Sequence, residues 1–298
     1  MLSNCDMTRL KQALDSRPSG AKPFIWNFYS EKTMSALLFE KSGPIVKLTI
    51  NRPDTRNPLG EEGDGDLFAE TCARINADRD VRCAILTGAG KAFSAGGNLK
   101  SMRERSGSFA GAAVHIRERY RNGIHRMVKA LWNLEVPLIA AVNGPAIGLG
   151  NDVACLADMR IAADNAIFGA TFLKVGLVPG DGGAWILPRT IGHARAAELF
   201  FTGDTIDAQT ALSWGLISKV VPADQLASEA QALAERVCCQ PPDVLRMTKK
   251  LMREGQGVSF DTIMEMSAAM QSIAHLTADH GEAVAAFFDK RKPEFKGE

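Results

Sequence analysis

The sequence has no long apolar run, no excess of one charge and no paired cysteine motif. No stretch of its 298 residues reaches the roughly 20 consecutive apolar residues that a helix needs to span a bilayer. Lysine and arginine (35) nearly equal aspartate and glutamate (34), so a net charge of +1 gives no bulk attraction to nucleic acid or to an anionic membrane. The six cysteines include no C-x-x-C pair and no histidine at metal-ligand spacing. We therefore expect a cytoplasmic protein with reduced, mostly buried thiols, no metal, and neither nucleic acid nor membrane as a partner.

The first 33 residues differ from the rest of the chain. They carry Asp6, Asp15 and Glu31 and lack the apolar core of a secretory signal. Met34 then precedes a strand-like alternation of apolar and polar residues. We hypothesise that Met34 is the natural start, and that residues 1–33 are an N-terminal extension that need not be native.

The remaining sequence changes character along its length. Apolar, β-rich runs alternate with helical patterns at 62–79 and 110–133, and this alternation predicts an α/β fold. From about residue 193 onward the periodicity is helical and the β-like runs stop. We expect an α/β core over residues 34–225 and a helical C-terminal region over 226–298. The predicted strands lie at 36–41, 44–51, 82–88, 137–143 and 159–164.

Glycine is concentrated in stretches that follow two of these strands. GAGKAFSAGG at 88–97 is not a phosphate-binding P-loop, because Ala92 follows Lys91 where the P-loop has serine or threonine. GLGND at 148–152 lacks the third glycine of a dinucleotide-binding fingerprint. AFSAG at 92–96 begins with alanine where a nucleophile elbow has glycine. None of these motifs assigns the chain a nucleotide or a serine nucleophile.

Two glycine-rich turns can instead serve one ligand together. The turns SAGGN at 94–98 and GLG at 148–150 each precede a helical pattern, and the N–H groups at helix starts favour anions. If the two turns meet, their backbone N–H groups can bind one anionic oxygen as an oxyanion hole. Either turn alone is more simply explained as a tight loop.

Five separated segments carry a resemblance to a known family. Over residues 34–298 and in the same order, they resemble the enoyl-CoA hydratase/isomerase (crotonase) family. The resemblance implies an α/β fold, a crotonase-like spiral of ββα units, with a helical C-terminal trimerisation region and trimers commonly stacked into hexamers. It implies an acyl-CoA substrate and no cofactor other than the coenzyme A of that substrate. The segments are NRPDTRNPL (51–59), LTGAGKAFSAGGNLKSM (86–102), PLIAAVNGPAIGLGNDVACLADMRIAADNAIFG (137–169), VGLVPGDGGAWILPRTIG (175–192) and AFFDKRKPEFK (286–296).

The resemblance also implies roles for single residues. The two N–H groups that bind the thioester oxygen in the family fall on Gly97 and Leu149. Positions that hold coenzyme A in the family fall on Ser94, Ala95, Lys100 and Lys290, with Arg56 as a weaker candidate. For the basic end KRK at 290–292, a solvated helix terminus remains the alternative interpretation.

The sequence departs from the family pattern at the catalytic carboxylates. Family hydratases use two glutamates, one to take a proton from water and one to deliver a proton to carbon. These positions hold Asp152 and Phe172 here, and phenylalanine cannot titrate. Asp181, in the loop VPGDGG, is a second candidate for proton transfer, although aspartate before two glycines is also ordinary turn chemistry. We expect Phe172 and Trp185 to form an apolar wall of the acyl pocket.

We therefore predict an enzyme of fatty-acid or related acyl-CoA metabolism that works through a thioester enolate. Double-bond isomerisation, which one shuttling carboxylate can perform, is favoured over hydration. Hydration of a 2-enoyl-CoA, hydrolysis and decarboxylation of an acyl-CoA remain alternatives on the same oxyanion hole. A non-enzymatic CoA-binding module that has lost the second glutamate is the alternative from another class.

Overall fold

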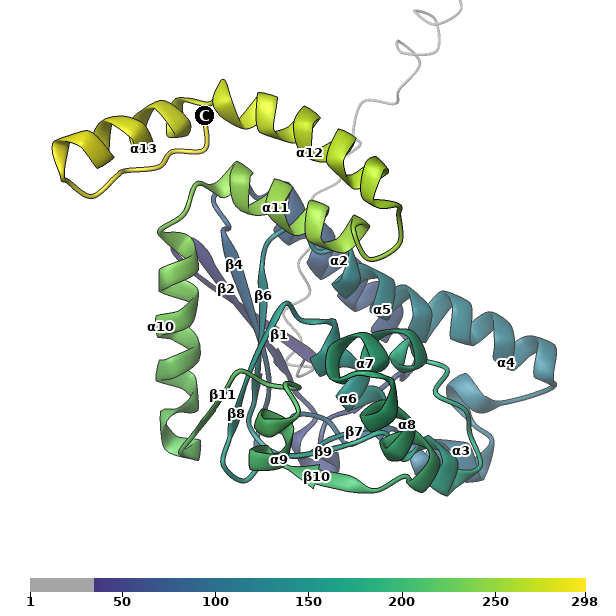
Figure 1. Cartoon of the computed structure of the whole chain (residues 1–298). Coiled ribbons are helices and arrows are strands. Elements are labelled where there is room, and N and C mark those ends of the chain that lie inside the picture. Colours follow the sequence, from purple (N-terminus) through teal and green to yellow (C-terminus); the bar gives the residue numbers. More distant parts are fainter. Residues whose placement is uncertain (1–34) are drawn as a thin grey trace, which may run out of the picture. The chain divides into compact units, whose positions relative to one another are not determined.

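A six-stranded sheet lies at the centre of the computed structural model, which describes residues 35–298 (Figure 1). The strand order is β1-β2-β4-β6-β8-β11; β1 pairs antiparallel with β2, and every later neighbour is parallel. The hypotheses about residues 1–33 and Met34 lie outside the described residues. The strands are β1 (Leu37–Ser42), β2 (Ile45–Ile50), β4 (Cys83–Gly88), β6 (Leu138–Val142), β8 (Met159–Ala163) and β11 (Lys219–Val221).

Two smaller sheets lie beyond the ends of the central strands. In one, β3 (Pro58–Leu59) pairs in parallel with β5 (Gly96–Gly97). In the other, β9 (Ile167–Gly169) lies between β7 (Ala146–Ile147) and β10 (Thr205–Asp207). The strand β5 thus lies within the SAGGN turn, and β7 directly precedes the GLG turn.

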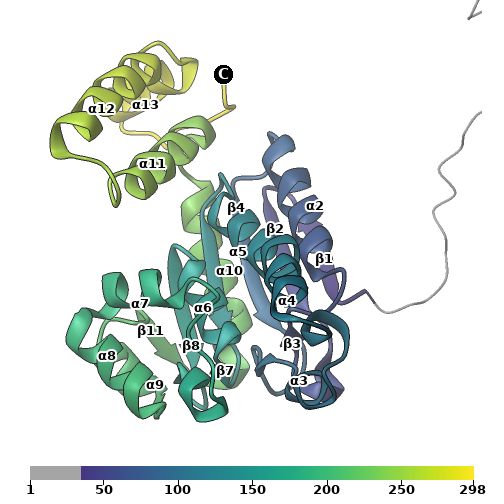
Figure 2. The same cartoon turned by 90° about the vertical axis from the view of Figure 1, so that its right-hand side faces the viewer.

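Helices cover the sheet and extend beyond it (Figures 1 and 2). The α-helices are α2 (Asp64–Ala77), α3 (Leu99–Glu104), α4 (Ala113–Arg119), α5 (His125–Trp132), α6 (Leu149–Leu156), α7 (Gly183–Ile191), α8 (His193–Thr202), α9 (Ala208–Ser213), α10 (Leu226–Cys238), α11 (Pro242–Glu254), α12 (Phe260–His275) and α13 (Ala278–Asp289). Shorter helical segments are η1 (Pro53–Thr55), η2 (Gly107–Phe109), η3 (Tyr120–Ile124), η4 (Thr171–Val175) and η5 (Ala223–Gln225).

The central sheet is buried on both faces, which explains the nearly continuous apolar character of its strands. Along β4, Ala84 and Leu86 pack into the larger core, while Cys83 and Ile85 face the core under α10. In Figure 1, α10 lies on one side of the sheet and α2 and α5 lie on the other. The strands β2, β4, β6 and β8 therefore bury apolar side chains on both faces, and the predicted α/β architecture is confirmed.

The structure differs from the sequence prediction in two places, after residue 193 and within the helical stretch 110–133. The β-like runs do not stop at residue 193, because β10 and β11 follow it, and β11 joins the central sheet beside β8. Such short strands gain their stability from pairing partners rather than from their own pattern. The helical stretch predicted at 110–133 is interrupted by a π-helical turn at η3, which keeps a helical hydrophobic pattern and so escapes detection by periodicity.

The described cysteines are free: Cys72, Cys83 and Cys155 are buried, Cys238 is partly buried, and Cys239 is exposed. Within residues 35–298, no helix is long and apolar enough to cross a membrane. In the same range, no three histidine, cysteine, aspartate or glutamate side chains are grouped to hold a metal ion.

Candidate active site

The two glycine-rich turns are joined by their backbones. Ser94 N donates to Pro145 O at 3.1 Å, and Ile147 N donates to Ser94 O at 3.0 Å. The side-chain hydroxyl of Ser94 accepts from Gly96 N at 3.1 Å, and the residue is fully buried. Ser94 therefore holds the two turns together, and the prediction that this segment contacts coenzyme A stays a prediction.

Glycine is needed here because the backbones approach too closely for side chains. A Cβ on Gly150 would lie 2.4 Å from Ser94 O, and a Cβ on Gly96 would lie 2.4 Å from Ile147 O. The same Cβ on Gly96 would reach within 3.3 Å of Leu149 N, so bare backbone leaves the space beside that N–H open. Gly148 has φ 54° and ψ −121°, a conformation that L-residues with a side chain rarely adopt.

A cavity of about 100 Å³ opens where the two turns meet. Gly97 and Leu149 both line it, and Leu149 is the first residue of α6, whose N–H has no partner within the helix. The helix start adds a partial positive charge at the same place. The structure thus brings the two predicted N–H donors to one cavity, although they are 52 positions apart in the chain (149 − 97).

The two candidate carboxylates occupy different depths. Asp181 lines the cavity and is 5% exposed, whereas Asp152 is fully buried beneath it on α6. Asp152 Oδ2 accepts from Gly183 N, the first residue of α7, at 3.0 Å. Oδ1 of each aspartate is buried without a hydrogen-bond partner among the described residues. Of these two carboxylates, Asp181 is the one that lines the cavity.

Burial makes both carboxyl groups weak acids. It raises the pKa of Asp181 to about 6, against a smaller opposing effect of His125. It raises the pKa of Asp152 to about 8, with a further contribution from the negative charge of Asp181 and a smaller opposing effect of the Gly183 N–H. Near neutral pH, Asp181 is the ionised member of the pair, and Asp152 is the protonated one.

Two residues beside Asp181 were not found by sequence reasoning. His125 Nε2 lies 2.8 Å from Gly180 O, which ties the start of α5 to the loop that carries Asp181. Tyr120, at the start of the π-turn, lines the cavity, and burial together with the charge of Asp181 raises the pKa of its phenol to about 12. The glycine at position 123, inside a helical pattern, is the one sequence signal of this irregular turn.

The predicted walls of the acyl pocket are only partly brought together. Phe172 lines the cavity, with two of its ring carbons 3.9 Å from where a Cβ on Gly148 would lie. Trp185 instead lines a second cavity, where its ring meets that of Trp132 edge-on at 5.2 Å. Trp185 lies on α7 and does not line the cavity beside Gly97 and Leu149, and its place in the acyl wall stays a prediction.

The predicted coenzyme A residues also separate into two groups. Ala95 lines the cavity and donates its N–H to Arg56 O at 2.8 Å, and exposed Lys100 follows on the first turn of α3. Lys290 follows the end of α13, which lies at the opposite end of the described structure from α3 (Figures 1 and 2). Within one chain, Lys290 is not beside the cavity.

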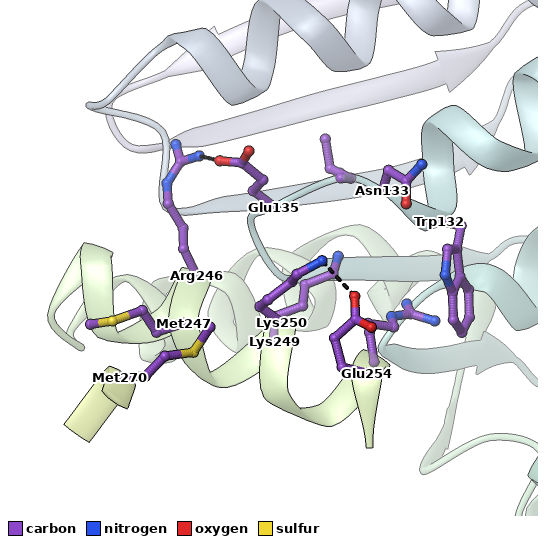
Figure 3. Close-up of a pocket in the computed structure, with 11 residues that line it drawn as sticks. Trp132, Asn133, Glu135, Arg246, Met247, Lys249, Lys250, Glu254 and Met270 are labelled. Atoms are coloured by element: carbon purple, nitrogen blue, oxygen red, sulfur yellow. Dashed lines mark hydrogen bonds and ion pairs between the residues drawn. The ribbon is translucent and has the colours of Figure 1, made fainter. Parts of the chain in front are cut away.

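Another cavity, of about 430 Å³, lies between α11 and the loop after α5 and is rich in cations (Figure 3). Its cations already have partners: Arg246 pairs with Glu135 at 2.7 Å, Lys249 with Asp158 at 2.8 Å, and Lys250 with Glu254. Arg246 and Lys249 are themselves buried. These ion pairs anchor α11 to the core, so this cavity is a poor candidate for an anionic ligand.

Comparison with known proteins shows which family the chain resembles. The family model described as "Enoyl-CoA hydratase/isomerase" matches residues 40–298. The 1,2-epoxyphenylacetyl-CoA isomerase of Escherichia coli (strain K12) is 36% identical over 264 residues, which cover 89% of this chain and 99% of that protein. The short-chain-enoyl-CoA hydratase of Clostridium acetobutylicum is 33% identical, with coverage of 88% and 97%. The crystal structure of an enoyl-CoA hydratase from Bacillus anthracis superposes with a TM-score of 0.83 at 33% identity, covering 89% of this chain and all of that one. The predicted crotonase-like fold is confirmed.

Proposed function

The chain belongs to the enoyl-CoA hydratase/isomerase family and is an enzyme of that family acting on acyl-CoA, and within it we propose that the chain moves the double bond of an enoyl-CoA thioester. One observation carries this proposal. The cavity that holds the backbone of Gly97 and Leu149 is lined by a single carboxylate, Asp181, and the family's second glutamate position holds Phe172. Isomerisation needs one proton shuttle, whereas hydration needs two titrating groups and an activated water.

In the proposed reaction, the thioester oxygen of a 3-enoyl-CoA accepts hydrogen bonds from the N–H groups of Gly97 and Leu149. Asp181 removes a proton from Cα, and the electron pair delocalises over the thioester and the double bond as a dienolate. The same carboxyl group returns the proton at Cγ, which gives the conjugated 2-enoyl-CoA. Each N–H donor to the developing oxyanion contributes on the order of 3 kcal/mol in enzymes where one has been removed.

Asp152 has a supporting part in this proposal. Its carboxyl group does not line the cavity, and its Oδ2 is engaged by Gly183 N at the start of the next helix. Being protonated near neutral pH, it adds no second negative charge beside Asp181 when the enolate forms. It therefore tunes the proton-transfer group rather than replacing it.

Hydration is the second candidate, and the pairing of Asp152 with Asp181 favours it. The two carboxyl groups titrate with pKa values of about 8 and about 6, as an acid and a base would near neutral pH. Two of the relatives compared above are also named hydratases. Against this candidate, Phe172 stands where a second glutamate would activate water.

The two candidates are separated by paired assays in deuterated water, one with crotonyl-CoA and one with 3-hexenoyl-CoA. We expect no loss of the conjugated thioester absorbance from crotonyl-CoA, and a gain of that absorbance from 3-hexenoyl-CoA with deuterium content followed by mass spectrometry. Water addition to crotonyl-CoA at a rate comparable to conversion of the 3-enoyl compound would contradict isomerisation and establish hydration.

We also propose a homotrimer or hexamer, with coenzyme A phosphates contacted by Lys100 and Arg56 and by Lys290 of a second copy. The C-terminal helices α12 and α13 support this, because they carry large apolar side chains that one chain leaves exposed. Light scattering during size-exclusion chromatography tests the assembly; a monomer at micromolar concentration would contradict it. The exposed side chains include Phe260 (76%), Leu276 (90%), Phe287 (79%) and Phe288 (77%).

A further inference from the structure

Three aromatic rings from three separate segments wall the cavity. Phe109 ends η2, Tyr120 starts the π-turn η3, and Phe172 lies in η4. The rings of Phe109 and Tyr120 meet at 66° with centroids 6.5 Å apart, in the edge-to-face range. The Phe172 ring faces Gly148, directly before the N–H of Leu149. An acyl group whose carbonyl oxygen is bound at Leu149 therefore meets these three rings among seven larger aliphatic side chains that also line the cavity.

The Tyr120 ring is fixed before any ligand binds. It also packs edge-on against His125, with centroids 5.9 Å apart. His125 is held in turn by Gly180 O at 2.8 Å. Tyr120 and Ile124, the first and last residues of the π-turn, both line the cavity. A preorganised wall favours a rigid ligand, because little further ordering is lost on binding.

The size and polarity of the cavity limit what fits. Its volume of about 100 Å³ is of the order of the roughly 150 Å³ apolar cavity known to accept benzene. Among the residues lining it, polar side chains come from Tyr120, Thr171 and Asp181 alone. A flat ring gains edge-to-face contacts with these walls that an alkyl chain of the same reach does not.

We propose that the acyl group bound in this cavity carries one aromatic ring, and that Phe109, Tyr120 and Phe172 select it over an alkyl chain of equal reach. The inference rests on the proposed binding of the thioester by Gly97 and Leu149. It adds the substrate class to the proposed function and makes the three aromatic residues determinants of specificity.

The test compares two saturated thioesters of similar reach, 3-phenylpropanoyl-CoA and heptanoyl-CoA. Their dissociation constants are measured by calorimetry against free coenzyme A, and exchange of their α-protons in deuterated water is followed by mass spectrometry. We expect the phenyl compound to bind about tenfold more tightly, as favourable ring pairs of ordinary strength would give.

Variants of Tyr120 test whether its aromatic ring causes the preference for the phenyl thioester. Tyr120→Leu is expected to reduce the preference to within twofold, and Tyr120→Phe, which keeps the ring, is expected to retain it. Phe109→Leu serves the same purpose if Tyr120→Leu does not fold. Phe201→Leu is the matched control, because Phe201 is 77% exposed on α8.

The outcomes distinguish the two levels of the proposal. Equal or tighter binding of heptanoyl-CoA, or an unchanged preference in both leucine variants at the cavity, overturns the aromatic substrate class and leaves the enolate chemistry standing. If neither thioester binds better than free coenzyme A and neither exchanges its α-protons, both the substrate class and the proposed thioester site are wrong.

Discussion

Replacing Asp181 by asparagine removes the one carboxylate that lines the cavity while keeping its shape. The side chain is 5% exposed, and its Oδ1 has no partner among the described residues, so no structural hydrogen bond at that atom is lost. Asparagine cannot accept the proton. General acid–base groups contribute about 10²- to 10⁴-fold to rate, so we expect kcat to fall by that factor, or about 3–5.5 kcal/mol in the barrier. KM is expected to change by less than about threefold, because the amide fills the same space.

The assay is the steady-state conversion of 3-hexenoyl-CoA, followed by absorbance from about pH 5 to 9. Activity is expected to rise with pH through about 6, because Asp181 must be ionised to act as the base. It is expected to fall above about 8, where Asp152 ionises and places a second negative charge beside Asp181. Asp152→Asn is the matched control: it keeps the rising limb, loses the falling limb and lowers kcat by less than about tenfold. Retention of more than a tenth of the wild-type kcat by Asp181→Asn, or the same rising limb in that variant, would refute the role of Asp181.

Three further predictions concern stability and backbone placement. The pKa of Asp152 in the folded protein, about 8, exceeds its ordinary value of 3.8, so folding takes up a proton between these pH values. The free energy of unfolding of the wild type is therefore expected to fall as pH rises, by up to about 1.4 kcal/mol per pH unit from this group, and Asp152→Asn is expected to remove that slope. Denaturant titrations at pH 5 and pH 8 that show the same loss of stability in both proteins would contradict this. Gly150→Ala places a methyl group within 2.4 Å of Ser94 O and is expected to lower kcat about 10²-fold, because the two turns must move apart. The control Gly281→Ala has no atom within 4 Å of the added Cβ and is expected to leave kcat unchanged. Equal kcat values for the two variants would show that activity does not require close approach of the turns. Asp158→Ala leaves Lys249 and Arg253 on α11, which are buried or nearly so, without this carboxylate partner. It is expected to lower the free energy of unfolding, measured in urea, by about 3–5 kcal/mol. A loss of less than about 1 kcal/mol would show that these ion pairs do not anchor the helix.

The sequence was most informative where structure is set locally. Glycines at 96, 148 and 150 signalled bare backbone because no other residue tolerates those contacts or torsions, and the structure shows the contacts. The central strands were recognisable because burial on both faces makes them apolar throughout. The short strand β11 was missed because three residues carry no pattern of their own, and it exists only through pairing with β8.

Residue type and order alone show that two glycine-rich turns follow two strands and that Phe172 stands where family hydratases have a glutamate. The sequence could not rank Asp152 against Asp181, because the difference between them is depth: α7 packs over α6 and buries one carboxyl group while leaving the other at the cavity. Nor could it show that Trp185 lines another cavity while Tyr120 lines the one beside Gly97 and Leu149, because both placements depend on contacts between segments far apart in the sequence. The type of each residue thus indicates the chemistry that it can perform. Packing between distant segments decides whether the residue can transfer a proton, line the pocket or support the structure.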